Sequence, residues 1–313
     1  MQRRLAHFFL SLAAALLLVA CTDHEVPAPA AAPPKVLWLG TSIPSMSAYP
    51  LVASQRLGLR CTNRAVGSTF VVFDSAQVER PKLHEGFCLT ASSEEKRRKF
   101  AKALASGALS AADFEVMQFT SYDRLLLPAL DSVDYVVIDH GFNDRASIAR
   151  TLRAIDQGEP FDWESRDRSH FVGALNFLID LIAQHNPKAK IIIGGYFQNT
   201  LNTSSMPSAA VCELQARYAQ RKGLPLLDVW RHLDFGASYV PNSQHYLDEF
   251  NAQYGTDYVN LFPDAAGNVT RFQYYCPDGV HPHTDLTGRS DQLLNEVYTQ
   301  LLGKAIGRGV QQK

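Results

Sequence analysis

Short apolar runs alternate with amphipathic segments along most of the chain. Five runs have the length and composition of buried strands, and they cover residues 35–40, 60–66, 134–139, 189–195 and 224–229. Runs that are apolar at almost every position are typical of strands covered on both faces, as in a parallel sheet. The sequence therefore predicts a parallel sheet of about five strands.

Helical patterns lie between and after these runs. Residues 48–59 and 210–220 have the composition of helices. In two further segments apolar side chains recur at helical spacing. The first contains Phe171, Leu175, Leu178, Ile179 and Ile182, and the second contains Leu293, Val297 and Leu301. Strands alternating with helices predict a three-layer α/β/α sandwich of the flavodoxin-like type. In that architecture ligands bind at the carboxyl ends of the strands.

Two connections are longer than ordinary loops, and we interpret them as insertions near residues 67–133 and 230–276. The second is rich in aromatic residues: Tyr246, Phe250, Tyr254, Tyr258, Phe262, Phe272, Tyr274 and Tyr275. Their rings could line a substrate-binding rim or form a small core of the insertion itself. The pattern alone is compatible with both.

The first residues have the pattern of an export signal. Arg3 and Arg4 precede an apolar stretch that ends in "LVAC" at Cys21. These four residues resemble the lipobox of bacterial lipoproteins, which implies cleavage after residue 20 and a lipid on the Cys21 sulfur. An ordinary signal peptide cut at Ala20 and an uncleaved anchor are the alternatives. Thr22, where an Asp would favour the inner membrane, points to the outer membrane.

A Pro/Ala-rich stretch at residues 21–34 follows and is typical of an extended tether. The remainder, residues 35–313, has the length of one large domain. The chain carries 30 basic and 31 acidic residues, a formal net charge of −1, and has no basic block. Nothing in this charge pattern indicates a nucleic-acid partner.

Four cysteines follow the tether, at Cys61, Cys88, Cys212 and Cys276. In an oxidising compartment they could form two disulfides, and free thiols are the alternative. The predicted sheet disfavours a bond between Cys61, at the start of a strand, and Cys276, near the opposite edge. No His or Cys spacing is typical of a metal site, so we expect no zinc.

The segment "PDGVHPH" carries Asp278 and His281 three residues apart. A turn would bring the carboxylate to one ring nitrogen of His281, fix the tautomer and leave the other nitrogen as a base. A surface turn followed by a capped helix is the alternative. The catalytic interpretation requires a nucleophile elsewhere in the chain.

Three other segments end predicted strands with suitable chemistry. "GTSIP" places Ser42 after the first strand, where its hydroxyl could be a nucleophile, a cap or a phosphate ligand. "NRAVGST" supplies small residues after the second, and "HGFND" supplies the Asn143 amide after the third. All three, with "PDGVH", are expected at one edge of the sheet.

In this set of segments the chain resembles the SGNH hydrolases of the GDSL esterase/lipase superfamily. The resemblance implies Ser42 as nucleophile, His281 as base and Asp278 as its partner. It also implies an oxyanion hole formed by the Ser42 backbone N–H, an N–H of Gly67 or Ser68, and the Asn143 side chain. The chain departs from the family at Thr41, where an Asp is usual, and Gly67 is the better match of the two candidates.

The implied activity is hydrolysis of carboxylic esters without a cofactor. Export among glycans favours removal of O-acetyl or other short acyl groups from a carbohydrate of the cell envelope. A lipase for long acyl chains and a non-catalytic glycan-binding surface lipoprotein are the alternatives, whereas a phosphate or flavin binder leaves "DGVH" unexplained. His140 and His283 also lie beside the expected site, but neither has an Asp three residues before it in the family pattern.

Overall fold

The computed structural model describes residues 31–65, 70–72, 130, 132–197, 208–233, 238–282 and 289–309. The compact unit of the chain runs from Pro34 to Lys313. The expected signal sequence and Cys21 lie outside the described residues. Within the described part of the chain, no helix has both the length and the apolar composition needed to span a bilayer.

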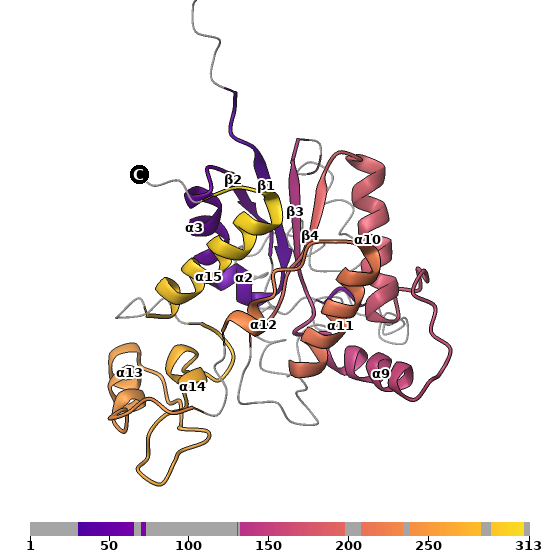
Figure 1. Ribbon diagram of the computed structural model, residues 1–313. Coiled ribbons are helices and arrows are strands. Elements are labelled where there is room, and N and C mark those ends of the chain that lie inside the picture. The colour runs from indigo at the N-terminus through magenta and orange to yellow at the C-terminus, as the bar shows by residue number, and fades with distance from the viewer. Residues whose placement is uncertain are drawn as a thin grey trace, which may run out of the picture. The chain divides into compact units, whose positions relative to one another are not determined.

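The centre of this unit is a parallel sheet with the strand order β2-β1-β3-β4 (Figure 1). Its strands are β1 (Lys35–Gly40), β2 (Arg60–Asn63), β3 (Tyr135–Asp139) and β4 (Lys190–Ile193). Each begins within a residue of its predicted start.

The fifth predicted run, residues 224–229, forms a single parallel bridge between Leu226 and Ile193. Two backbone hydrogen bonds hold it there, from Ile193 N to Pro225 O and from Leu227 N to Ile193 O. Pro225 has no N–H to extend the ladder, so the pairing stays short. The described sheet thus has four strands and one bridged edge segment.

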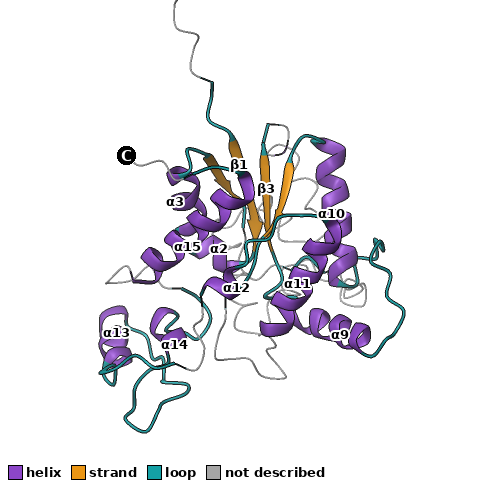
Figure 2. Cartoon of the chain, in the orientation of Figure 1, coloured by secondary structure: helices purple, strands orange, loops and turns teal. Residues whose placement is uncertain are grey.

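Helices cover both faces of the sheet (Figure 2). They are α2 (Ser42–Met46), α3 (Tyr49–Arg56), α9 (Arg145–Asp156), α10 (Phe171–His185), α11 (Ser208–Lys222), α12 (Val229–His232), α13 (Tyr246–Tyr254), α14 (Arg271–Tyr275) and α15 (Arg289–Ile306). α3 and α15 pack together on one face, while α10 and α11 lie on the other (Figure 1). The predicted α/β/α sandwich is confirmed.

An aromatic cluster joins α3 and α15 to the sheet. The rings of Tyr49 and Tyr298 stack with their centroids 3.7 Å apart, and Trp38 of β1 meets both edge-on at 5.5 and 6.0 Å. All three side chains are almost fully buried. Their burial removes several hundred Å² of apolar surface from water, which stabilises this face of the sandwich by several kcal/mol.

The aromatic insertion before "PDGVH" packs partly within itself and partly against the main core, which includes Phe272. Phe250 of α13 and Phe272 of α14 are fully buried, and Tyr246 lies 4.5 Å from Tyr274 between ring centroids. Tyr254 and Phe262 keep about two fifths of their surface exposed, at 40% and 38%. Of the two interpretations of these rings, the small core therefore describes most of them better than a substrate-binding rim.

Cys61, Cys212 and Cys276 all carry free thiols. The two-disulfide alternative is therefore wrong, because it needs all four cysteines to be paired. Cys88 lies outside the described residues. Burial raises the pKa of Cys212 well above its usual value, so the thiol stays protonated, and it donates to the Tyr196 carbonyl at 3.2 Å. Such thiols behave as small apolar side chains.

Candidate active site

Ser42 begins α2 directly after β1, at the carboxyl edge of the sheet. Gly40, the last residue of β1, pairs in register with Asp139, the last residue of β3. A side chain at Gly40 would lie 2.6 Å from the Asp139 carbonyl oxygen and from the Pro44 ring. Only glycine therefore fits at position 40, where the backbone passes close to Asp139 and Pro44. This close approach allows the chain to turn sharply and places Ser42 at the edge of the sheet.

The "PDGVH" segment folds into a tight turn. Gly279 N donates to the Cys276 carbonyl at 2.7 Å, and Gly279 has a φ of 76°, a left-handed conformation that favours glycine. The Asp278 carboxylate oxygen Oδ1 accepts from the backbone N–H groups of Val280 and His281, at 2.8 and 2.7 Å. This local hydrogen bonding is typical of Asp in turns.

The same turn brings His281 between Asp278 and Ser42. Nδ1 of His281 lies 2.6 Å from Oδ2 of Asp278, and Nε2 lies 2.8 Å from Oγ of Ser42, which is 239 residues away in sequence. With Nδ1–H donating to the carboxylate, Nε2 carries the lone pair that accepts the Ser42 hydroxyl. The three side chains thus form one continuous hydrogen-bonded relay.

The electrostatics of Asp278 suit an ionised partner for histidine. Partial burial raises its pKa, but the hydrogen bond from His281, the charge of that ring and the two backbone N–H groups outweigh burial. The net pKa lies below the usual value, so Asp278 carries its charge at neutral pH. A fixed negative charge beside Nδ1 stabilises an imidazolium when Nε2 takes a proton.

Gln273 of α14 ties the aromatic insertion to this turn. Its Nε2 donates to the carbonyls of Val259 and Pro277, at 2.6 and 3.3 Å, and its Oε1 accepts from Leu261 N at 2.9 Å. The side chain is only 1% exposed. Since Pro277 immediately precedes Asp278, the hydrogen bond from Gln273 helps to hold Asp278 in place.

Asn143 lies half-buried in the turn between β3 and α9, at the carboxyl edge that also carries Ser42. The third element of the expected oxyanion hole, Gly67 or Ser68, lies outside the described residues. The choice between these two backbone N–H groups therefore stays a prediction.

The other two histidines near the site were expected to be bystanders. His140 is 2% exposed, and burial lowers its pKa to about 3, so the ring is neutral over the physiological range. Its backbone carbonyl accepts from Gln215 Nε2 at 2.7 Å. His283 lies outside the described residues.

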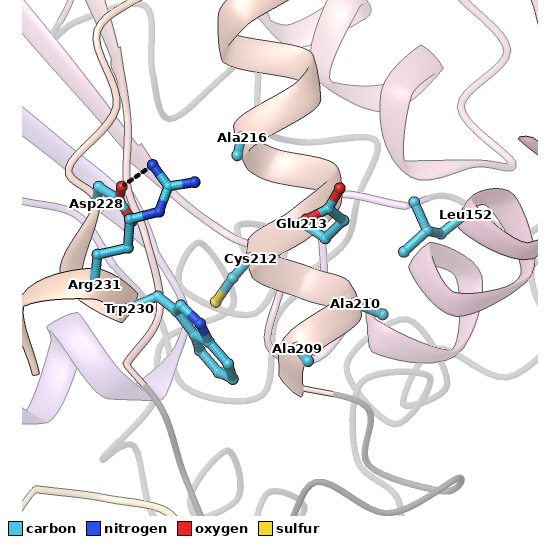
Figure 3. A pocket seen from close by; sticks show the side chains of 9 residues that line it. All are labelled: Leu152, Ala209, Ala210, Cys212, Glu213, Ala216, Asp228, Trp230 and Arg231. Carbon is cyan, nitrogen blue, oxygen red and sulfur yellow. Dashed lines mark ion pairs between the residues drawn. The ribbon is translucent and has the colours of Figure 1, made fainter. Parts of the chain in front are cut away.

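No group of three or more His, Cys, Asp or Glu residues is placed to hold a metal ion in the part of the chain that the structure describes. A hollow of about 370 Å³ lies between α9, α11 and α12, and its lining includes Cys212, Trp230 and Arg231 (Figure 3). Asp228 also lines this hollow and forms an ion pair with Arg231 at 3.3 Å.

Sequence reasoning missed the side chains that support these groups. The Asp139 carboxylate, at the end of β3, accepts from the Tyr49 hydroxyl at 2.7 Å. Asp144 accepts from two remote backbone N–H groups. Because Asp144 directly follows Asn143 in "GFND", its place in the sequence could have indicated that it lies near the site. The partners of Asp139 and Gln273 depend on tertiary packing, which no local sequence pattern specifies.

Comparisons with known proteins give structural likenesses at low identity. No family model and no curated protein matches the chain. A possible lipase from Chitinophaga pinensis DSM 2588 is 12% identical to this chain; the match covers 87% of this chain and 98% of that chain, with a TM-score of 0.44. An acetyl-xylooligosaccharide esterase from Geobacillus stearmophilus is 14% identical, with 90% and 97% of the two chains covered and a TM-score of 0.39. LAE5, an alpha/beta hydrolase enzyme from the metagenome of Lake Arreo, Spain, is 16% identical, with 86% and 95% covered and a TM-score of 0.38.

Asp139 should make the stability of the protein depend on pH. Burial raises its pKa to about 7, although the hydrogen bond from Tyr49 lowers it. The folded state therefore binds a proton that the unfolded state releases above about pH 4, so stability falls as the pH rises towards about 7, by up to about 1.4 kcal/mol per pH unit. Asp139→Asn cannot titrate and keeps an acceptor for Tyr49, so it should gain stability relative to the wild type between pH 5 and pH 8.

Urea unfolding of both proteins at the two pH values measures this difference. Asp248→Asn, at an exposed carboxylate of α13, is the control and should show no such gain. A difference between Asp139→Asn and the wild type that is the same at both pH values would contradict the buried carboxyl as its source.

Proposed function

We propose that this protein is a serine hydrolase acting on carboxylic esters, with Ser42 as nucleophile, His281 as general base and acid, and Asp278 as the partner of His281. The observation that carries the proposal is the relay from Ser42 Oγ through both ring nitrogens of His281 to the Asp278 carboxylate, with distances of 2.8 and 2.6 Å. A nucleophile joined to a base that a third group orients is the arrangement that activates a serine hydroxyl.

In the first half-reaction His281 Nε2 takes the Ser42 proton while Oγ bonds to the ester carbonyl carbon. The carbonyl π electrons move to oxygen, and the resulting oxyanion accepts hydrogen bonds from the Ser42 N–H, the Asn143 amide and an N–H of Gly67 or Ser68. When the tetrahedral intermediate collapses, the bond to the alcohol oxygen breaks and His281 gives its proton to that oxygen.

In the second half-reaction water replaces the alcohol. His281 takes a proton from water, the hydroxide oxygen bonds to the acyl carbon, and collapse returns the proton to Ser42 and releases the acid. Asp278 keeps its negative charge throughout and stabilises the imidazolium in both steps. All protons are supplied by side chains and water, and the steps need no other reactant.

The substrate we favour is a carbohydrate of the cell envelope that carries O-acetyl or other short acyl groups. The export signal supports this assignment because it would place the enzyme among such glycans. One observation favours a second candidate, an esterase for long acyl chains: Val259, Leu261 and Phe262 are exposed by 67%, 40% and 38%. These side chains lie on the loop that Gln273 connects to the Asp278 turn.

We also propose that the mature protein is anchored to the envelope by lipid on Cys21, most simply in the outer membrane. The support is the "LVAC" segment, the tether that follows it, and Thr22 in place of an Asp. A single lipid-modified cysteine with two or more acyl chains would hold the domain at the membrane surface.

Covalent labelling with a fluorophosphonate, read by mass spectrometry of the modified peptide, tests the nucleophile. The label should appear on Ser42 of the wild type and be lost in His281→Ala, whose kcat should fall by about 10³-fold or more because no base activates the hydroxyl. His185→Ala, at an exposed histidine that ends α10, should label and turn over as the wild type does.

A wild-type protein that is folded by circular dichroism but neither labels at Ser42 nor hydrolyses a p-nitrophenyl ester would overturn the proposal. Labelling that persists unchanged in His281→Ala would instead show that another group activates Ser42.

Comparing p-nitrophenyl esters of two, four, eight and twelve acyl carbons tests the substrate class. An enzyme for short acyl groups should have its highest kcat/KM with the acetyl ester, because in a site built for short groups no buried contact would offset the ordering cost of a longer chain. A rise of about tenfold or more for each pair of buried methylene groups would favour the long-chain alternative. In that case Leu261→Ser should lower the long-chain rates alone.

Metabolic labelling with a radioactive fatty acid in a bacterial host tests the anchor. The wild type should incorporate label and sediment with membranes, whereas Cys21→Ser should do neither. Incorporation that survives in Cys21→Ser would place the lipid on another residue, and no incorporation in either protein would favour a soluble exported enzyme.

A further inference from the structure

The turn that carries Asn143 is tethered at both ends. Before it, Gln215 Nε2 of α11 donates to the His140 carbonyl at 2.7 Å, and both residues are about 2% exposed. After it, Arg145 Nη1 donates back to the Phe142 carbonyl at 2.8 Å, and its guanidinium carbon lies 4.5 Å from the centre of the Phe142 ring. These contacts fix the backbone on either side of Asn143.

Asp144 holds the same turn to a remote part of the chain. It occupies the N-cap position of α9, where an Asp side chain ordinarily accepts from the first N–H groups of its own helix, yet it makes no such bond. Instead Oδ1 accepts from the backbone N–H groups of Val71 and Val72, at 3.0 and 2.9 Å, more than 70 residues earlier in sequence. The side chain therefore links two loops of the carboxyl edge.

This link is costly for the folded state. Asp144 is 2% exposed, and within the described residues its second oxygen, Oδ2, is buried with no hydrogen-bond partner. Burial raises the pKa of Asp144 to about 7, even though the backbone N–H groups of Val72, Val71 and its own turn lower it. A buried carboxyl of this kind is a poor source of stability.

We propose that Asp144 is a positioning residue for the oxyanion hole: by fastening the turn after β3 to Val71 and Val72, it keeps the Asn143 amide where it can donate to the oxyanion. The role rests on the proposed ester hydrolysis. Asp144 itself touches neither substrate nor nucleophile and acts through Asn143. Without it, Asn143 would still be present, but its amide would be free to move away from the developing charge.

A double-mutant cycle with Asn143 tests this role. Loss of one oxyanion donor lowers kcat by about 10²–10³-fold, so Asn143→Ala should fall in that range, and Asp144→Ala should lower kcat by about 10–10²-fold with KM changed by less than about threefold. Because both act on one hydrogen bond, the double variant should be no slower than Asn143→Ala alone within about threefold. Asp144→Asn keeps an acceptor for both N–H groups and should recover most of the rate.

Asn186→Ala is the matched control. Asn186 follows the last residue of α10, at the opposite edge of the sheet. Its amide also makes two hydrogen bonds to a remote segment, donating to the carbonyls of Leu130 and Val133 at 2.8 Å. Its loss should lower thermal stability but leave kcat per active site unchanged. Active sites are counted by fluorophosphonate labelling, so that unfolded protein does not enter kcat.

Two results would overturn the role. One is a kcat of Asp144→Ala equal to that of the wild type per labelled site. The other is a fall in kcat that adds fully to that of Asn143→Ala, which would mean that Asp144 acts elsewhere. If Asp144→Ala does not fold, Asp144→Asn decides alone, and a rate as low as that of Asn143→Ala contradicts the proposal. If the wild-type protein neither labels nor turns over an ester, the proposed function is wrong and the proposed role of Asp144 is wrong with it.

Discussion

The parallel pairing of β1 with β3 is the constraint on which the whole site depends. Its register sets Gly40 beside Asp139, so that the chain leaves both strands at the same level of the same edge. Ser42 follows one strand by two residues and Asn143 follows the other by four. A slip of the register would move Ser42 and Asn143 apart by more than 3 Å per residue. The buried apolar side chains of both strands oppose such a slip.

Around this pairing, the protein holds several carboxyl groups partly or fully buried, although burying a carboxyl group costs free energy. Asp144 is buried and Asp139 is partly buried, and burial raises the pKa of each to about 7. Asp278, by contrast, is surrounded by donors and stays charged. The edge therefore contains one carboxylate kept ionised beside His281 and two others held by hydroxyl or backbone donors. Such departures from a purely apolar interior concentrate where a protein performs chemistry.

Much of this arrangement could be predicted from the sequence. The apolar runs at residues 35–40 and 134–139 are uninterrupted enough to identify buried strands, and the offset between Asp278 and His281 is short enough for a turn to join them. α9 was not predicted, although Ile148, Leu152 and Ile155 recur at helical spacing in its sequence and pack on the core, so this signal was overlooked rather than absent. Gln273 and Asp144 could not be assigned a role, because each acts across a distance in sequence that only the folded chain closes.

The crystal structure of the phosphonate adduct is the most direct test of the account. A phosphonate on a serine mimics the tetrahedral intermediate, and its phosphoryl oxygen occupies the position of the oxyanion. The account predicts phosphorus bonded to Ser42 Oγ and a phosphoryl oxygen within about 3 Å of the Ser42 backbone nitrogen and of Asn143 Nδ2. An adduct on another residue, or a phosphoryl oxygen turned away from Asn143, would contradict it.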